Sequence, residues 1–255
     1  RSLQGPKALP HLDAARAGAV LVVGAGPTLD LGRVERASRA GVSIWTVNSA
    51  ARAVCEVCAP DVVVVRESLD VSAQLDRLTH APRAILVDLH AHPAVWRAAG
   101  DIGAFFVPAA LQSFPLAVGL GVAPVYAGTA SLTAAVALAA AGGAQWIGLE
   151  GVDLAYGRDG AGYAAGAAYA ATLTRVEGAG GVLAGGEAQA ALARASGQEP
   201  PPSAPRLHLV HAREGLPLHA QGPWLSQIEW LETFAARRPM LPLSRGLGLA
   251  DLVGW

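Results

Sequence analysis

Cysteine, net charge and long apolar runs are all scarce in this sequence, and each scarcity excludes a class of protein. There are only two cysteines in 255 residues, so a disulfide framework is excluded and a reducing compartment is favoured. The formal net charge is −1, which lacks the basic excess of proteins that bind nucleic acid or membrane surfaces. The longest apolar candidate, Ser131–Gly143, is too short to span a bilayer.

Two further features concern cellular context. Cys55 and Cys58 have the spacing of a redox or metal pair, but they stand alone in a helical run, and we interpret them as small buried residues. No signal peptide is visible, so we expect a cytoplasmic protein. The chain begins with Arg1 instead of Met, which leads us to expect a trimmed chain or an excised domain.

What the sequence has in abundance is apolar residues, at 52%, against 15% charged residues. Apolar runs and helical segments alternate along the chain, and fully apolar strands belong to parallel sheets covered on both faces. We therefore predict an α/β fold with a Rossmann-like, doubly wound, mostly parallel sheet. The strands are predicted at 20–23, 42–47, 61–65, 84–87, 104–107 and 146–149, and the helices at 30–40, 49–58, 71–79, 93–99 and 129–141.

The pattern changes after residue 156. Residues 157–205 are rich in Ala, Gly and Pro, and we interpret them as a helical and loop insertion or lid, with helices at 163–175 and 187–195. Residues 1–156 would form the nucleotide-binding core, and residues 206–255 would complete it. In that last part we expect a strand at 207–210, an amphipathic helix at 224–237 and a strand at 239–243.

The first candidate site is the turn Gly24-Ala25-Gly26-Pro27-Thr28, between a buried strand and a helix. Its glycines allow a tight turn, and the amides of the helix N-terminus could bind a phosphate. On this reading, a Gly26→Val substitution abolishes nucleotide binding and leaves the fold intact. The plainer alternative is a glycine turn in which Thr28 caps the helix.

Polar side chains also follow the second and third strands, and ligands bind at the carboxyl ends of parallel strands. Asn48 and Ser49 could contact a base or ribose, or could simply cap a helix. Glu67 is expected at the ligand edge and Asp61 at the far edge or in the turn before it, where solvated carboxylates are the alternative.

A second anion site is predicted at Gly128, Thr129, Ala130 and Ser131, which precede a long helix. Asp153, Tyr156 and Tyr163 follow the next strand, and the two tyrosines could donate hydrogen bonds to a departing phosphate. A capped helix and a turn aspartate are the alternative.

These segments, in this order, resemble the core domain of the motility accessory factor family. The resemblance is carried by GAGPTLD (24–30), VNSA (47–50), PDVVV (60–64) and the segment from Gly128 to Tyr156. That family comprises flagellin glycosyltransferases that use CMP-activated nonulosonic acids. The same core is similar to bacterial sialyltransferases and to 6-hydroxymethylpterin diphosphokinases.

The resemblance implies roles for individual residues. Gly24, Gly26, Pro27 and Thr28 would border the nucleotide and Asn48 would contact cytosine or ribose. Thr129, Ala130 and Ser131 would hold the sugar carboxylate and phosphate, and Tyr156 and Tyr163 the leaving phosphate. His219 precedes the segment 229–232 at the spacing of a catalytic histidine, and it would act as the base.

Three functions follow as alternatives. The first is a glycosyltransferase that moves a nonulosonic sugar from a CMP-sugar to an acceptor such as flagellin, with no required metal. The second is a diphosphokinase that uses ATP, with Mg²⁺ bound by Asp61, Glu67 and Asp153. The third is a nucleotide-binding domain without catalysis.

Overall fold

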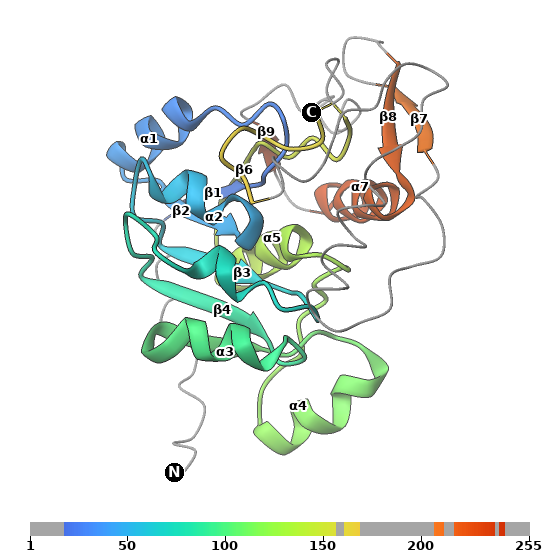
Figure 1. Ribbon diagram of the computed structural model, residues 1–255. Helices are drawn as coiled ribbons and strands as arrows, with labels where there is room; N and C mark the ends of the chain where they lie inside the picture. Colours follow the sequence, from blue (N-terminus) through green and yellow to red (C-terminus); the bar gives the residue numbers. More distant parts are fainter. Residues whose placement is uncertain (1–17, 157–160, 169–206, 212–216, 238–239, 243–255) are drawn as a thin grey trace.

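A parallel sheet of seven strands forms the centre of the described part of this computed structural model (Figure 1). The structure describes residues 18–156, 161–168, 207–211, 217–237 and 240–242. The strand order is β5-β4-β3-β2-β1-β6-β9, and every neighbouring pair is parallel. The strands are β1 (Ala19–Val23), β2 (Ser43–Val47), β3 (Val62–Val65), β4 (Ala84–Asp88), β5 (Gly103–Phe106), β6 (Trp146–Glu150) and β9 (Met240–Pro242).

The chain reverses its direction of winding next to β1. From β1 it proceeds outward through β2, β3 and β4 to β5, and then returns to place β6 on the other side of β1. Such a reversal opens a crevice at the carboxyl ends of the two strands that flank it. The predicted Rossmann-like, doubly wound fold is therefore confirmed, and its switch point lies between β1 and β6.

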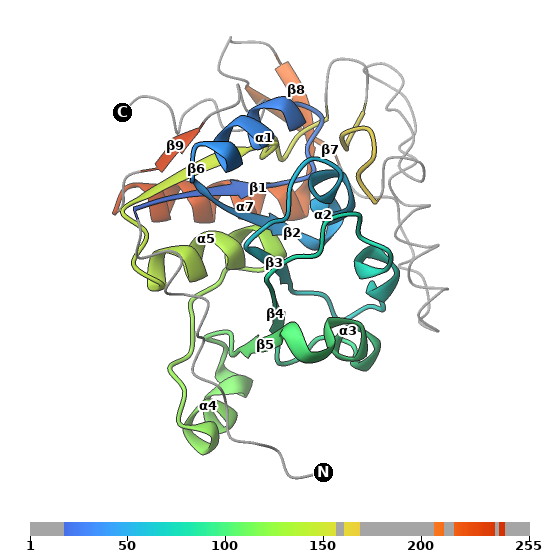
Figure 2. The same cartoon turned by 90° about the vertical axis from the view of Figure 1, so that its left-hand side faces the viewer.

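Helices cover both faces of the sheet, as Figures 1 and 2 show. One face carries α1 (Leu31–Arg39), α2 (Asn48–Cys55), the 3-10 turn Ser72–Leu75 and α3 (Pro93–Ala99), and the other carries α5 (Ser131–Ala141). The helix α7 (Gly222–Ala235) contacts α5 in turn. Burial on both faces explains why the strands are apolar throughout.

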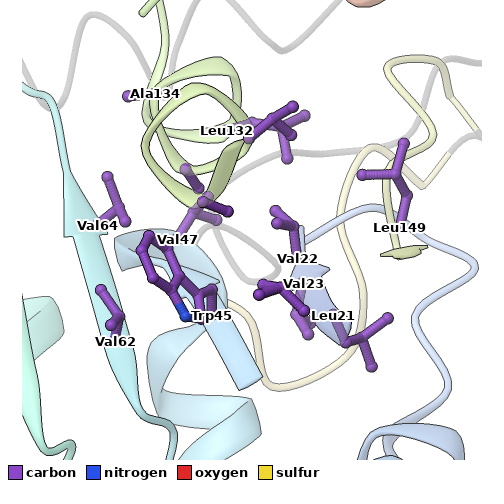
Figure 3. Close-up of a cluster of buried hydrophobic side chains, with 14 of the residues drawn as sticks. Leu21, Val22, Val23, Trp45, Val47, Val62, Val64, Leu132, Ala134 and Leu149 are labelled. Atoms are coloured by element: carbon purple, nitrogen blue, oxygen red, sulfur yellow. The ribbon is translucent and has the colours of Figure 1, made fainter. Parts of the chain in front are cut away.

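The largest core lies between the sheet and α5 (Figure 3). Trp45 and Val47 from β2 point toward this helix beside Val62 and Val64 from β3. All but the last residue of α5 are buried, because the sheet packs on one of its sides and α7 on another. A helix in that position has no solvated face, which accounts for its sequence of alanine, leucine and valine. Within the described residues, no helix combines the length and the apolar character that a membrane span requires.

Several predicted elements differ from the structure. The helix predicted at 71–79 is only the 3-10 turn Ser72–Leu75, and the helix α4 (Phe114–Leu120) was not predicted. The strand predicted at 207–210 is β7 (Leu207–His211), which pairs with β8 (Pro217–Gln221) in a separate antiparallel sheet. The last predicted strand is confirmed as β9.

The two cysteines occupy the positions expected of small core residues. Cys55 ends α2, Cys58 follows it, and both thiols are free and buried. Burial raises the pKa of Cys55 to about 12 and also raises that of Cys58, so neither is a reactive thiolate at neutral pH.

Residues 161–168 are the described part of the predicted insertion. They form bends and turns, so the helix predicted at 163–175 does not start at Tyr163. The remainder of that helix, the helix predicted at 187–195 and the segment 1–17 lie outside the described residues.

Candidate functional site

An open pocket lies at the carboxyl edge of the sheet between β1 and β6 and encloses about 660 Å³ when the adjoining solvent is included. Its walls come from the ends of β1, β2, β3 and β6, from the first turns of α2 and α5, and from α7. The lining residues are Gly24, Ala25, Gly26, Val47, Asn48, Ser49, Glu67, Ala130, Ser131, Leu132, Gly151, Val152, Asp153, Leu154, Gly162, Tyr163, Trp224 and Gln227.

The backbone amides of the first glycine loop, residues 24–30, point toward β6. Gly24 N donates to the carbonyl of Glu150 (2.8 Å), and Gly26 N donates to the carbonyl of Gly151 (2.7 Å). Thr28 N donates to Oδ2 of Asp153 (2.8 Å). These three amides therefore have acceptors inside the protein, whereas Gly24, Ala25 and Gly26 line the pocket, and the nucleotide contact of this loop stays a prediction.

Asp153 fastens the first loop to the segment after β6. Its carboxylate also accepts from the Thr28 hydroxyl (2.6 Å), and the residue is only 1% exposed. Asp153 lines the pocket, whereas Pro27 and Thr28 do not. The interpretation of Thr28 as a nucleotide contact is thus replaced by an internal clamp.

Close approach of the two segments explains the glycines. A Cβ at position 26 would overlap Oδ2 of Asp153 and lie 2.7 Å from the carbonyl oxygen of Gly151. A Cβ at position 24 would lie 2.5 Å from the same carbonyl oxygen. The predicted Gly26→Val phenotype is corrected accordingly, because the valine would collide with the protein itself and disturb the fold.

The N-terminus of α1 is also occupied by carboxylates of the chain. Asp30 is its N-cap and accepts from Arg33 N (3.1 Å), while the fully buried Glu150 accepts from Asp30 N (3.0 Å). Burial raises the pKa of Glu150, opposed by the Asp30 amide and by the Arg33 guanidinium 3.7 Å away. The positive end of this helix dipole is therefore already neutralised.

The N-terminus of α5 is open to the pocket. Ala130 is its N-cap and has no side-chain acceptor for the first-turn amides, and Ala130, Ser131 and Leu132 all line the pocket. The Ser131 hydroxyl accepts from Arg66 N (2.8 Å), which fixes the helix end against β3. The structure thus brings two predicted residues of the second loop, Ala130 and Ser131, to the site.

The other two predicted residues of that loop have a different role. Gly128 and Thr129 do not line the pocket. Gly128 has a φ of +61°, and a Cβ there would overlap the Thr133 side chain. Thr133 in turn donates to the carbonyl of Ala127 (2.8 Å). Gly128 is therefore needed for the turn that leads into α5.

The N-terminus of α2 faces the same pocket. Val47 is its N-cap and provides no side-chain acceptor, and Asn48 and Ser49 line the pocket. Asn48 is buried, and its amide donates to Oε1 of Gln74 (2.8 Å). This bond fixes the orientation of the Asn48 amide at the pocket wall.

Aromatic residues form another wall. Tyr163 and Trp224 line the pocket with ring centroids 6.3 Å apart, and Gln227 follows one turn later on α7. Tyr156 is 2% exposed and packs on Trp224 at 5.0 Å. Tyr156 does not line the pocket, so its predicted contact with a phosphate is not supported by its position.

The three carboxylates of the predicted metal site do not come together. Asp61 precedes β3 at the opposite edge, where it accepts from the Ser43 hydroxyl (2.9 Å) and pairs with Arg83 (3.1 Å). Only Glu67 and Asp153 line the pocket. Across the described ranges, no group of three or more histidine, cysteine, aspartate or glutamate residues is arranged to hold a metal ion.

Glu67 is a pocket carboxylate whose pKa is displaced from its ordinary value. Burial raises the pKa of the Glu67 carboxyl from 4.5 to about 7, so near neutral pH it can both hold and accept a proton. Within the part of the chain that the structure describes, its carboxyl has no hydrogen-bond or ion-pair partner.

His219 lies on β8, opposite Leu209 of β7. Its side chain is outside the described residues, so its role as a base stays a prediction. Trp224 and Gln227 line the pocket but were not predicted as site residues. Their spacing of three along an amphipathic helix was visible, but nothing in that spacing indicates which helix face closes a pocket.

Comparisons with known proteins show that the fold of this chain is similar to that of a solved structure. No model of a known family matches the chain, and no curated protein matches it. Among solved structures, the chain is similar to the MAf glycosyltransferase from Magnetospirillum magneticum AMB-1, with a TM-score of 0.61 and 14% identity. The likeness covers 95% of this chain but only 39% of that protein, and at this identity it establishes a shared fold.

Proposed function

We propose that this chain is a glycosyltransferase domain that moves a nonulosonic, sialic-acid-like sugar from a CMP-sugar donor to an acceptor hydroxyl. The observation that carries the proposal is the pocket at the β1–β6 switch point, which is lined by the first turns of α2 and α5, two helices whose N-cap residues Val47 and Ala130 have no side-chain acceptor. A CMP-nonulosonate carries two anionic groups, a phosphate and a carboxylate. Two uncapped helix ends at one pocket suit such a ligand.

The other pocket walls suit the remaining parts of this donor. Asn48 and Ser49 offer polar groups to a base or ribose, and Tyr163 and Trp224 offer a surface for a ring. In this proposal, Ala130 and Ser131 lie against the charged groups of the donor. The leaving phosphate is then stabilised by amides and by the Tyr163 hydroxyl, so a metal is not required.

The similar fold of a protein named MAf glycosyltransferase, together with the motifs that resemble its family, supports this proposal over the alternatives. The diphosphokinase alternative requires carboxylates gathered around Mg²⁺, and the position of Asp61 at the opposite edge weighs against it. An acceptor such as flagellin follows from the resemblance alone. The chain spans only 39% of the length of the similar protein.

The proposal is tested first by binding. Titration calorimetry with CMP, CDP, UDP, GDP and ATP, with and without Mg²⁺, should show preferred, metal-independent binding of CMP. Release of CMP from CMP-N-acetylneuraminic acid should then report transfer to water. Preferred Mg²⁺-dependent binding of ATP would favour the diphosphokinase. CMP binding without any turnover of several CMP-nonulosonates would favour the non-catalytic alternative.

A matched pair of variants tests the pocket assignment. Tyr163→Phe keeps the ring that contacts Trp224 and removes the hydroxyl, so CMP release should slow by about 10-fold or more. Tyr126→Phe makes the same change at an exposed ring outside the pocket, and its rate should match the wild type. Equal rates for both variants would contradict a role for the Tyr163 hydroxyl.

A further inference from the structure

Glu67 lines the pocket, and the proposed glycosyltransferase function has not yet given it a role. It follows β3 by two residues and lines the pocket between the first turns of α2 and α5. Its carboxyl is therefore at the edge of the sheet where a ligand would bind.

The other carboxylates near this edge already have partners. Asp153 accepts from the amide and the hydroxyl of Thr28, and Glu150 accepts from Asp30 N. Asp88 pairs with the Arg66 guanidinium at 3.1 Å and with His90. In the described residues, the Glu67 carboxyl makes no such contact, and it remains available to a ligand.

The backbone around Glu67 is held on both sides. Arg66 N donates to the Ser131 hydroxyl, and its guanidinium donates to the carbonyls of Ala127 and Gly128. The Glu67 carbonyl accepts from His92 N (3.3 Å). Residue 67 is therefore presented to the pocket by a fixed backbone, as positioned acid–base groups require.

The charged groups on the surrounding elements do not neutralise this carboxyl. Arg66 pairs with Asp88, His92 lies 3.9 Å from Asp70, and the Asp153 carboxylate accepts a hydrogen bond from Thr28. Burial alone accounts for the raised pKa of Glu67, at about 7. A carboxyl in that range is matched to proton transfer near neutral pH.

We infer that Glu67 is the general base of the transfer reaction, an inference that rests on the proposed function. Its carboxylate takes the proton of the acceptor hydroxyl as the acceptor oxygen forms a bond to the anomeric carbon. The bond between that carbon and the phosphate oxygen breaks, and its electron pair leaves with the nucleoside monophosphate. This assignment gives Glu67 the task that the resemblance assigns to His219.

The first test is turnover of CMP-N-acetylneuraminic acid with water as acceptor, followed as CMP release. Glu67→Gln should lower kcat by roughly 10²–10⁴-fold and change the dissociation constant of CMP by less than about twofold. Glu67→Asp keeps the acid and should retain more activity than Glu67→Gln. Asp70→Asn removes a carboxylate three residues away and outside the pocket, and it should turn over like the wild type.

The second test is the pH profile. The wild-type rate should rise with pH through an apparent pKa near 7, and Glu67→Gln should lose this limb. The ionisation enthalpy of a carboxyl is small, whereas that of an imidazole is large, so this apparent pKa should barely change with temperature. An apparent pKa that falls on warming, with a limb lost in His219→Asn and kept in Glu67→Gln, would overturn the inference.

Failure of this inference is distinguishable from failure of the proposed function. If wild-type protein neither binds CMP nor releases it from the donor, the proposed function itself is wrong. If it does both and Glu67→Gln turns over like the wild type, only the assignment of Glu67 is wrong.

Discussion

The two glycine-containing loops before α1 and α5 look alike in sequence. They differ in whether carboxylates of the chain accept hydrogen bonds from their backbone amides. Each leads into a helix N-terminus: the first joins β1 to α1, and the second connects α4 to α5. In the first loop, Asp153 and Glu150 take up the amides of Thr28 and Asp30, so the chain binds its own carboxylates there. In the second loop, Ala130 leaves the first turn of α5 open to the pocket.

A glycine turn before a helix therefore predicts the tight backbone turn, but it does not predict whether a ligand or a side chain of the protein binds the amides at the helix N-terminus. Gly24 and Gly26 are required because β6 and the segment after it pass close by. The helix end that lines the pocket belongs to the loop with the weaker glycine pattern. Whether the amides at a helix N-terminus are available to a ligand depends on acceptors that are far away in the sequence, as Asp153 is from Thr28.

The largest effect is expected from Gly26→Val, which forces the first loop away from Asp153. The collision with a buried carboxylate and with the Gly151 carbonyl should lower the free energy of unfolding by about 3 kcal/mol or more. Urea denaturation measures it. Gly119→Ala in α4 is the control, because its Cβ would enter open space, and it should raise stability by about 0.5–1 kcal/mol. A Gly26→Val protein as stable as wild type would contradict the interlocked loops.

A double-mutant cycle measures the clamp that the first loop has and the second lacks. Thr28→Val and Asp153→Asn should each cost about 1.5–3 kcal/mol, because they disturb hydrogen bonds to a buried carboxylate, and they should be coupled by about 1 kcal/mol or more. The cycle of Thr129→Val with Asp153→Asn is the control from the second loop, and it should be additive. Additivity in both cycles would remove the distinction between the loops.

A substitution at Ala130 should give α5 the kind of side-chain N-cap that Asp30 already provides for α1. Ala130 has the extended backbone of an N-cap (φ −133°, ψ 163°), so Ala130→Asp should cap α5 and raise stability by about 0.5–2 kcal/mol. Its charge would occupy the proposed anion site and weaken CMP binding by about tenfold. Ala130→Asn caps without a charge and should stabilise similarly with a smaller loss of affinity. Equal affinities for the two variants would count against anion binding at α5.

The smallest effect concerns the pH dependence of stability. Glu67 has a folded pKa of about 7, above its ordinary value of 4.5, so between these values the folded state holds a proton that the unfolded state has released. Stability from this group is therefore lost as the pH rises through that window. Glu67→Gln should flatten the slope and be more stable than wild type above pH 7 in urea denaturation.

Asp70→Asn is the control for that slope. A side-chain hydrogen bond from Ser72 lowers the pKa of Asp70 below 3.8, so the stability it contributes is lost only as the pH falls through that lowered value. Its slope between pH 4.5 and 7 should match the wild type. An unchanged slope in Glu67→Gln would show that the carboxyl is solvated.

Most of the central fold could be predicted from sequence, because its signals are local. Apolar strands such as 62–65 and the breaks after them define the alternation, and alternation with short connections implies a parallel sheet. The helix α4 could not be predicted, since Leu111, Phe114 and Val118 are exposed there and give no amphipathic pattern that faces the core. The separation of β7 and β8 from the main sheet depends on pairing between strands, which no single segment encodes.

The site was only partly predictable, because several of its contacts join residues that are far apart in the sequence. Asn48 and Glu67 follow strand ends, and the position at a strand end is sufficient to bring them to one edge. Ala130 and Ser131 were predicted at the start of a helix, which is where the structure has them. The partners of the first loop could not be predicted, because Thr28 and Asp153 are 125 residues apart. Burial of Tyr156 depends on Trp224, which belongs to a helix still further along the chain.

The clamp between Thr28 and Asp153 has a consequence for the order in which the molecule folds. A bond across 125 residues forms only after β6 has joined β1, and so the pocket is among the last features to form. Closure of so long a loop carries an entropic cost that local contacts cannot offset early. We therefore expect the amides of Gly24, Gly26 and Thr28 to exchange hydrogen with solvent only through opening of the β1–β6 pair, and a nascent chain to complete the pocket only after Trp224 and Gln227 of α7 have been made.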